Sequence, residues 1–270
     1  MNLHRFILLT IVIVYVYQTC SAQFLPGAKQ IALAHSDIAN VSDVFSAFTN
    51  PAGLAKINSF EMGVYYSPSP FGLKQLSNGF GGASNNFNFG TLAACFSTYG
   101  FDLYKENKIS LSFAKEIQTD FYAGISIFYN SLSIHKYGND NTFLITIGTS
   151  AKLADNITIG FTAENLTRST YGNDGGQIPS YFRSGVSYNI ASEFIVHLAL
   201  EKEIQNPLSV KFGLEFEPIE FINLRLGVMN EPDTFSGGLG ILYSYFRIDY
   251  AFFTHHDLGL THQAGLIINF

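Results

Sequence analysis

Charged residues and tryptophan are scarce in this sequence. It has no tryptophan, and only 13% of its residues are Asp, Glu, Lys or Arg. A soluble domain usually carries about a quarter charged residues, so the composition argues against an ordinary soluble fold. The formal net charge is -6 and no basic patch is present. Nucleic acid is therefore not an expected partner.

Long hydrophobic runs are also missing, apart from one near the N-terminus. That run extends from Phe6 to Tyr17 after a charged start, and it is too short to cross about 30 Å of hydrocarbon as a helix. With the small residues that follow, it predicts a signal peptide over residues 1–22, cleaved after Ala22. A lipoprotein signal at Cys20 is the alternative, although Tyr17 stands where an aliphatic residue is expected.

No later run approaches about 18 apolar residues, which excludes membrane-spanning helices from the mature protein. Cleavage leaves Cys95 as the only cysteine, so a disulfide framework is excluded as well. Cys95 lies in an apolar stretch, where a buried and inert thiol is expected. The mature protein is therefore either soluble and secreted or a membrane β-barrel.

Aromatic residues are abundant instead. The chain has 26 Phe and 15 Tyr, a density that suits the girdles and lipid-facing surface of a transmembrane barrel. Residues 260–270 also alternate as a strand does. The even-numbered side, from Leu260 to Phe270, is expected to face hydrocarbon, and the odd-numbered side, from Thr261 to Asn269, to face the lumen. An edge strand of a soluble sandwich is the alternative.

Gly, Asn, Asp, Pro and Ser divide the chain after residue 57 into short extended segments. Fourteen strands are predicted, at 58–68, 76–84, 88–98, 107–116, 120–133, 141–153, 156–166, 181–190, 193–202, 206–216, 220–229, 234–243, 245–254 and 260–270. A closed single-chain barrel requires an even number. If 76–84 is a loop, twelve strands is the fallback.

The predicted connections alternate between tight turns and longer loops, among them 99–106 and 167–180. The second of these is too rich in glycine to order itself. Because short turns of such barrels face the periplasm, both chain ends are expected on the periplasmic side.

The non-lipid faces of the predicted strands read mainly Gly, Ser and Thr, which suit a crowded lumen. The same faces carry six basic and five acidic side chains: Lys108, Lys152, Arg183, Lys211, Arg225, Arg247, Glu164, Glu193, Glu201, Glu215 and Asp249. Opposite charges in a narrow, low-dielectric lumen should pair. The predicted network comprises Lys108, Lys152, Glu164, Arg183, Glu201, Lys211 and Glu215. Alternatively, several of these charges lie at strand ends and pair with nothing.

Residues 23–57 precede the predicted barrel, 58–270, and carry helix signals. Ser42-Asp43 can cap a helix over 44–49, and Pro51 ends that helix and can begin another turn. This predicts a short helical hatch in or beneath the barrel, with Ser42, Asp43, Asn50, Pro51, Ala52, Gly53 and Leu54 as its principal residues. A simple tether is the alternative.

These N-terminal residues also carry a family resemblance. The segments 27–34, Ser42-Asp43 and 50–55 resemble the N-terminal signature of the PorV/PorQ-like outer-membrane proteins of Bacteroidota, and the likeness continues through 178–185 to the last strand. That group is related to the FadL-type fatty-acid transporters, which share the Asn-Pro-Ala-Gly element. The resemblance implies a fourteen-stranded barrel. It also implies either cargo binding in type IX secretion or passage of hydrophobic molecules through a hatch and a lateral opening.

The final strand resembles the closing-strand signal read by the barrel-assembly machinery, at Gln263, Gly265, Ile268 and Phe270. An enzyme is poorly supported. His255 and His256 are adjacent on a strand or turn and point apart, which is awkward for a shared metal. No Gly-x-Ser-x-Gly element occurs either. We expect no cofactor, no metal and no catalytic residues.

The leading hypothesis is an integral outer-membrane barrel that acts as a partner-binding accessory subunit of a secretion or assembly machine. Its expected partners are outer-membrane lipids, the barrel-assembly machinery and other outer-membrane or periplasmic proteins. The alternative is a FadL-like channel for passive uptake of small hydrophobic compounds.

Overall fold

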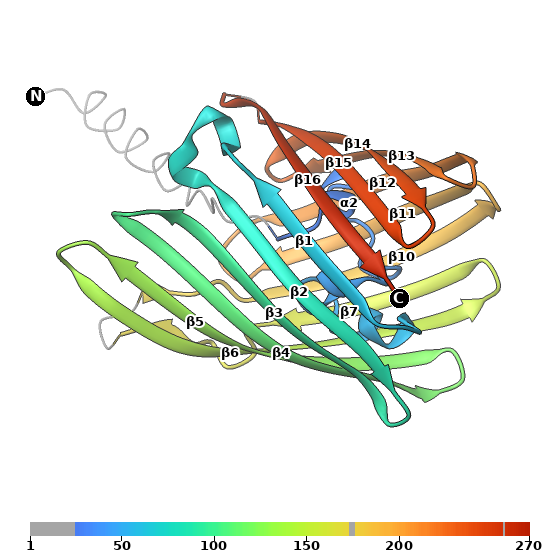
Figure 1. Cartoon of the computed structure of the whole chain (residues 1–270), viewed down its shortest axis with the longest axis horizontal. Coiled ribbons are helices and arrows are strands. Elements are labelled where there is room, and N and C mark those ends of the chain that lie inside the picture. Colours follow the sequence, from blue (N-terminus) through green and yellow to red (C-terminus); the bar gives the residue numbers. More distant parts are fainter. Residues whose placement is uncertain (1–24, 173–175, 256) are drawn as a thin grey trace, which may run out of the picture.

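A computed structural model describes residues 25–172, 176–255 and 257–270. The predicted signal peptide lies outside the described residues. Fourteen strands close into one antiparallel barrel (Figure 1), which confirms the predicted fold class. They are β1 (Glu61–Ser67), β2 (Asn78–Phe87), β3 (Gly90–Phe101), β4 (Tyr104–Gln118), β5 (Phe121–Ile134), β6 (Gly138–Ala154), β7 (Ile157–Glu164), β10 (Tyr181–Ala191), β11 (Phe194–Glu203), β12 (Leu208–Ile219), β13 (Ile222–Asn230), β14 (Asp233–Tyr243), β15 (Phe246–His255) and β16 (Gly259–Asn269).

Each barrel strand pairs with its neighbours in the sequence, except that β7 pairs with β10. The barrel closes where β1 meets β16, from Glu61 opposite Asn269 to Tyr66 opposite Ala264. The segment around 76–84 forms β2, which pairs with both β1 and β3. The twelve-strand fallback is therefore wrong.

Side chains alternate between the two faces as predicted. In β16, Thr261 and Gln263 are 1% and 2% exposed, whereas Leu260 is 52% exposed. Strand β12 repeats the pattern with Lys211 inside and Phe212 outside. Because the period of a strand is two residues, one register assigns every side chain of the strand to the lumen or the exterior.

The two ends of the barrel differ. At the turn end, as we call it, six two-residue turns join the strands, at 88–89, 119–120, 155–156, 192–193, 220–221 and 244–245. The opposite loop end carries the longer connections, although the predicted loop 99–106 is wrong. There β3 and β4 extend to a turn at Asp102 and Leu103, because cross-strand pairing continues to Phe101 opposite Tyr104.

The β7–β10 loop contains the glycine-rich stretch 171–176, of which 173–175 lie outside the described residues. Two short strands, β8 (Thr170–Tyr171) and β9 (Gly176–Gln177), pair within it. Asn165 organises its base, since its side-chain amide donates to the carbonyl oxygen of Ile178 at 2.9 Å and its side-chain oxygen accepts from the Ser169 amide at 2.9 Å. The buried Asn165 thus replaces secondary structure in satisfying the loop backbone.

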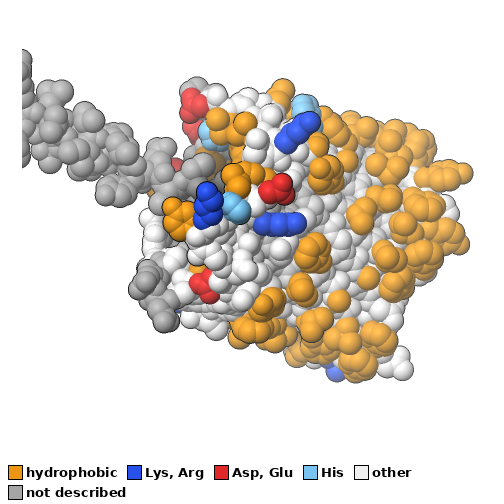
Figure 2. All heavy atoms as spheres, turned by 60° about the vertical axis from the view of Figure 1, so that its left-hand side comes forward, with side chains coloured by type: hydrophobic (Ala, Val, Ile, Leu, Met, Phe, Trp, Pro, Cys, Tyr) orange, Lys and Arg blue, Asp and Glu red, His pale blue; other side chains and the backbone are white. Residues whose placement is uncertain are grey.

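The exterior is strongly apolar. Outward-facing Leu, Ile, Val, Phe and Tyr side chains are exposed on strand after strand, and Figure 2 shows them covering the side of the barrel while charged side chains gather toward the loop end. An apolar surface of this extent would drive association in water, so the exterior suits hydrocarbon. Among the described residues, no helix has the length and apolarity needed to cross a membrane.

The segment before β1 lies inside the barrel (Figure 1, blue). We call residues 25–57 the plug. It contains α2 (Ala28–Ala32) and two 3-10 helices, η1 (Val44–Ala47) and η2 (Pro51–Lys56). Two further 3-10 turns, η3 (Pro70–Gly72) and η4 (Lys74–Leu76), lie in the β1–β2 loop.

Candidate functional site: the plugged lumen

The plug follows the inner wall at close range. A Cβ atom added at Gly124 in β5 would lie 2.4 Å from the Pro51 carbonyl carbon, and one added at Gly160 in β7 would lie 2.6 Å from the Ala39 Cα. Equivalent contacts under 3.0 Å involve plug atoms at Gly63, Gly148, Gly213, Gly227 and Gly238. Glycine on the inner face therefore lets the plug backbone approach the wall.

Wall side chains also satisfy the plug backbone. Three serine hydroxyls, from Ser126, Ser150 and Ser236, donate to plug carbonyl oxygens at 2.9, 2.9 and 3.0 Å. From the plug, the Asn50 amide donates to the carbonyl oxygens of Ile38 and Thr149 at 2.8 and 3.1 Å. Buried carbonyl groups need such partners, so the small polar residues of the lumen have a defined role.

The predicted hatch residues form two caps within the plug. Asp43 accepts a hydrogen bond from the Phe45 amide and caps η1, while Asn50 accepts from the Ala52 amide and caps η2 with Pro51 at its start. Gly53 is required by crowding, because a Cβ there would lie 2.4 Å from the Val41 carbonyl oxygen. Leu54 is fully buried and Ser42 is exposed. The short segments fold as 3-10 turns rather than α-helices.

One group of predicted lumen charges comes together on the wall. Arg183 in β10 bridges Glu164 at 2.7 Å and Glu201 at 2.5 Å, and Lys211 in β12 reaches Glu201 at 2.9 Å. The Arg183 and Lys211 side chains are 3% and 5% exposed. Every charge in this group has a partner of opposite sign, as buried charges require.

A second group joins the wall to the plug. Arg225 contacts Glu215 and Asp249 at 2.6 Å each, and Arg247 contacts Asp249 at 2.8 Å. Arg247 also reaches Asp43 of the plug at 2.6 Å, and Lys29 of the plug lies 3.5 Å from Glu215. Two ion pairs thus connect the plug to β12 and β15.

Two predicted members lie apart from these groups. Lys152 pairs with Asp155 at 3.0 Å across an exposed turn, so its placement in the lumen network is corrected. Glu193, also assigned to the lumen, is likewise an exposed turn residue, bonded to Ser192. Lys108 faces inward from β4, between Ser97 and Asn130 on the flanking strands. Residues at strand ends leave the lumen even when the alternation assigns them to it.

No local pattern in the sequence indicates the buried carboxylate of Asp37. It is 1% exposed, and within the described part of the chain neither of its carboxylate oxygens has a hydrogen-bond partner. Burial raises the pKa of Asp37 to about 6, against the opposing influence of Lys29. Nearby, burial lowers the pKa of His35 to about 3, and Lys211 adds to that effect. At neutral pH His35 is therefore uncharged.

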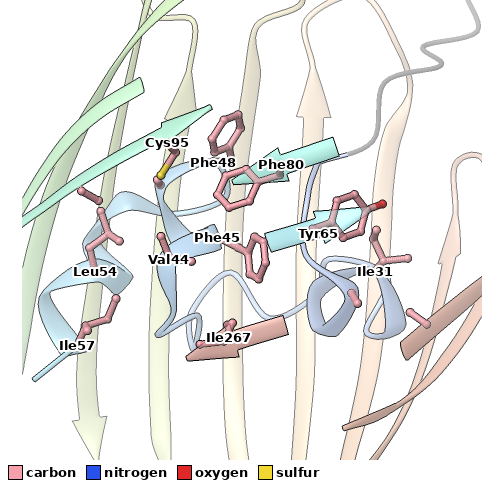
Figure 3. Close-up of a cluster of buried hydrophobic side chains, with 14 of the residues drawn as sticks. Ile31, Val44, Phe45, Phe48, Leu54, Ile57, Tyr65, Phe80, Cys95 and Ile267 are labelled. Carbon is pink, nitrogen blue, oxygen red and sulfur yellow. The ribbon is translucent and has the colours of Figure 1, made fainter. Parts of the chain in front are cut away.

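An apolar and aromatic cluster packs between the plug and β1–β6, among buried polar side chains of the same strands such as Ser110, Ser126 and Asn130. Phe45 of the plug lies 4.8 Å from Phe80, ring centre to ring centre, and Phe48 lies 5.3 Å from Phe80 and 5.0 Å from Phe128. Figure 3 shows Phe45 and Phe48 beside Phe80 and Tyr65 of the wall. These rings, with Leu144, Cys95 and Phe253, belong to one buried cluster, which we call the aromatic cluster. Cys95 is buried, as expected.

A pocket of about 280 Å³ opens at the loop end, between the β7–β10 loop and the β11–β12 turn. Its lining combines apolar Ile178, Pro179 and Ile204 with Arg168 and Glu203. Ile178 also packs against the buried apolar cluster of the lumen. Ile178 is thus shared by this pocket and the edge of the cluster.

The predicted assembly signal is divided between the two faces. Gln263 and Gly265 face inward, and Ile268 and Phe270 face outward. The Phe270 amide donates to the Phe60 carbonyl oxygen at 2.9 Å, and the two rings lie 5.9 Å apart. The last residue therefore closes the seam between the two ends of the barrel.

The lumen side chains form a packed apolar cluster and two groups of paired charges. Across the described ranges, no three His, Cys, Asp or Glu side chains gather as metal ligands. The lumen offers aromatic surface on one side and neutralised charges on the other. Such surroundings favour small apolar molecules and disfavour free ions.

Comparisons with known proteins agree with this geometry at the level of fold. No protein-family model and no curated protein matches the sequence. Among solved structures, the Pseudomonas putida toluene transporter TodX aligns with a TM-score of 0.70 at 11% identity, covering 90% of this chain and 98% of its own. The CymD monoaromatic hydrocarbon channel gives 0.68 at 12% identity, covering 91% and 97%.

A Pseudomonas aeruginosa FadL homologue gives a TM-score of 0.61 at 11% identity, covering 90% of this chain and 96% of its own. The barrel therefore shares the fold of FadL-type outer-membrane transporters. A specific relationship to PorV or PorQ stays a prediction from the sequence.

Proposed function

We propose that this protein is a FadL-like outer-membrane channel through which small hydrophobic compounds pass passively. The observation that carries the proposal is the aromatic cluster, which continues from the plug to Phe253 near the loop end of the lumen. Apolar surface removed from water contributes roughly 25 cal/mol per Å², so such a lining attracts an apolar solute along its whole length.

The similar solved structures support this assignment. Two of them are described as a toluene transporter and a monoaromatic hydrocarbon channel. We extend that substrate class, small apolar molecules, to this chain because its lumen has the matching lining. The same neighbours are channels, which favours a non-enzymatic role.

The plug makes the passage selective. Its backbone presses on the inner glycines, and its charges pair with Glu215 and Arg247. The aromatic cluster offers an apolar molecule a favourable surface that it does not offer to water or ions. We further propose that the loop end faces outward and the turn end faces the periplasm, as the short turns indicate.

An uptake assay in whole cells tests the proposal. A hydrophobic fluorescent probe, N-phenylnaphthylamine, and a hydrophilic sugar would be presented to cells that carry the protein and to matched cells without it. Faster entry of the probe alone is expected. Deleting residues 32–54 should admit the sugar as well, and unchanged uptake of both solutes after this deletion would argue against a role for the plug.

A partner-binding role in secretion is the second candidate. The filled lumen with its buried ion pairs favours it. The Asn-Pro-Ala-Gly element at 50–53 is common to both families, and the solved structures with this fold support the channel more strongly. Affinity purification from detergent-solubilised membranes separates the two. Consistent recovery of one outer-membrane or periplasmic protein would favour the partner-binding role, and recovery of the barrel alone would favour the channel.

A further inference from the structure

The β1–β2 loop, residues 68–77, folds over the loop end of the lumen. Its second half is attached to β3, because the Gly100 amide donates to the Ser77 carbonyl oxygen at 3.1 Å and the Ser77 hydroxyl donates to the Gly100 carbonyl oxygen at 3.3 Å. Its first half contains η3 and turns toward β15 and β16. The loop is therefore fixed at one side and reaches inward at the other.

Phe71 is the side chain that reaches inward. Its ring meets Phe253 edge to face at 5.8 Å and His255 at 5.4 Å, and its amide donates to the Thr261 hydroxyl at 2.9 Å. Phe253 is 4% exposed and belongs to the aromatic cluster, against which Phe71 packs. Phe71 thus covers the aromatic cluster at the loop end.

The backbone at this point is held in an unusual conformation. Phe71 has φ 55° and ψ 26°, and Gly72 follows with φ 76°. A bulky side chain in the left-handed region is strained, and the contacts to Phe253, His255 and Thr261 hold it there. A return of Phe71 to the ordinary helical region would relieve the strain and lift the ring from Phe253. A second arrangement of the loop, with Phe71 in the ordinary helical region, would be one that a bound molecule can bias.

We propose that Phe71 is a gate that selects permeants by size at the loop end of the aromatic cluster. The inference rests on the proposed channel function and adds a specificity-determining residue to it. In the closed arrangement the ring occupies the position that an apolar molecule would take against Phe253. A small molecule displaces the ring briefly, whereas a larger one needs the loop to open further.

Uptake by whole cells of toluene, with one ring, and of N-phenylnaphthylamine, with a larger ring system, tests the gate. Phe71→Ala should raise the rate for the larger probe several-fold and the rate for toluene much less. Leu73→Ala is the matched control, because Leu73 lies in the same loop and is 50% exposed. Equal size preference in wild type, Phe71→Ala and Leu73→Ala would overturn the gate while leaving channel function intact. No uptake by the wild type would instead overturn the channel.

A second variant provides a readout that does not depend on transport. The chain has no tryptophan, so Phe71→Trp introduces a single tryptophan at the gate, whose emission can be excited selectively over that of tyrosine. Adding toluene to the purified protein should shift its emission to longer wavelength as the ring leaves Phe253, and an unchanged emission at saturating toluene would contradict gate movement. If Phe71→Ala fails to assemble, Phe71→Leu takes its place in the uptake assay.

Discussion

Asp43 and Arg247 stand 204 positions apart in the chain and meet at 2.6 Å inside the barrel. The same carboxylate caps η1 and accepts two hydrogen bonds from the Gln30 side chain, at 3.2 and 3.1 Å. Arg247 in turn contacts Asp249 on its own strand. The ion pair between Asp43 and Arg247 therefore connects α2 and η1 of the plug to the wall.

Arg247→Ala should loosen the plug and lower the free energy of unfolding by about 3–5 kcal/mol, because it leaves the buried carboxylate of Asp43 without its cation. Urea unfolding of the purified protein, followed by the gel shift between folded and heated barrel, measures the change. Lys152→Ala is the control. Its ion pair with Asp155 is exposed, so no measurable loss is expected. Equal stability of the two variants would contradict the structural role of the pair.

Gly124→Ala should displace η2, because the new Cβ would lie 2.4 Å from the Pro51 carbonyl carbon. Overpacking of this kind costs about 1–3 kcal/mol. Gly81→Ala is the matched change in β2, where nothing lies within 4 Å of the added atom, and it should be neutral or slightly stabilising. Amide hydrogen exchange across residues 50–57 measures the displacement. Equal protection from exchange in both variants would show that the plug does not need glycine at position 124 of the wall.

Asp37 should make stability depend on pH between about 4 and 6. Its pKa rises from 3.8 to about 6 in the fold, so the folded protein binds more protons than the unfolded chain in this window. The contribution of Asp37 to the free energy of unfolding is therefore complete below pH 3.8, and it is lost as the pH rises through about 6. This change in the pKa of Asp37 corresponds to a change of about 3 kcal/mol in the free energy of unfolding.

Asp37→Asn should remove this dependence of the free energy of unfolding on pH. Because the charges facing Asp37 (Lys29, Lys211, Asp43 and Glu215) are common to both proteins, the difference between wild type and variant isolates its effect. The stability of both proteins would be measured by urea unfolding from pH 4 to pH 7. Parallel curves would contradict the burial of an ionisable Asp37.

Removal of Phe270 should reduce the fraction of folded barrel in the outer membrane, because it deletes the hydrogen bond and ring contact with Phe60 that close the seam. Quantitative gels of unheated membranes measure that fraction. Phe87→Ala is the control, since Phe87 is an outward aromatic residue at the end of β2 and stacks on Phe89. A folded fraction equal to that of the control would argue against an assembly signal at Phe270.

Much of the wall could be predicted from local pattern, and the reason is geometric. In 121–129, 208–216 and 260–270, a period of two residues together with one apolar face fixes the direction of every side chain. The caps at Asp43 and Asn50 were also visible, because a capping side chain bonds to an amide two or three residues away in the sequence.

Contacts between distant strands could not be predicted in this way. The pairing of Asp43 with Arg247 depends on where the plug comes to rest, and the exposure of Lys152 depends on where β6 ends. The burial of the Asp37 carboxylate depends on where the plug lies and on which wall residues face it. The loop predicted at 99–106 is wrong for a related reason, since β3 and β4 continue pairing through residues with ordinary turn composition. Neighbouring residues determine which face of a strand a side chain occupies and where a helix is capped. Strand register and barrel closure determine which distant residues come into contact.

The central claim is that the lumen passes apolar molecules and excludes ions, and reconstitution tests it most directly. The purified protein would be placed in asymmetric vesicles with a lipopolysaccharide outer leaflet, and the entry of N-phenylnaphthylamine and the ionic conductance would be recorded on the same preparation. The structure predicts saturable entry of the probe with no steady ohmic current. Probe entry at the rate of protein-free vesicles, or a sustained ion current, would contradict the account.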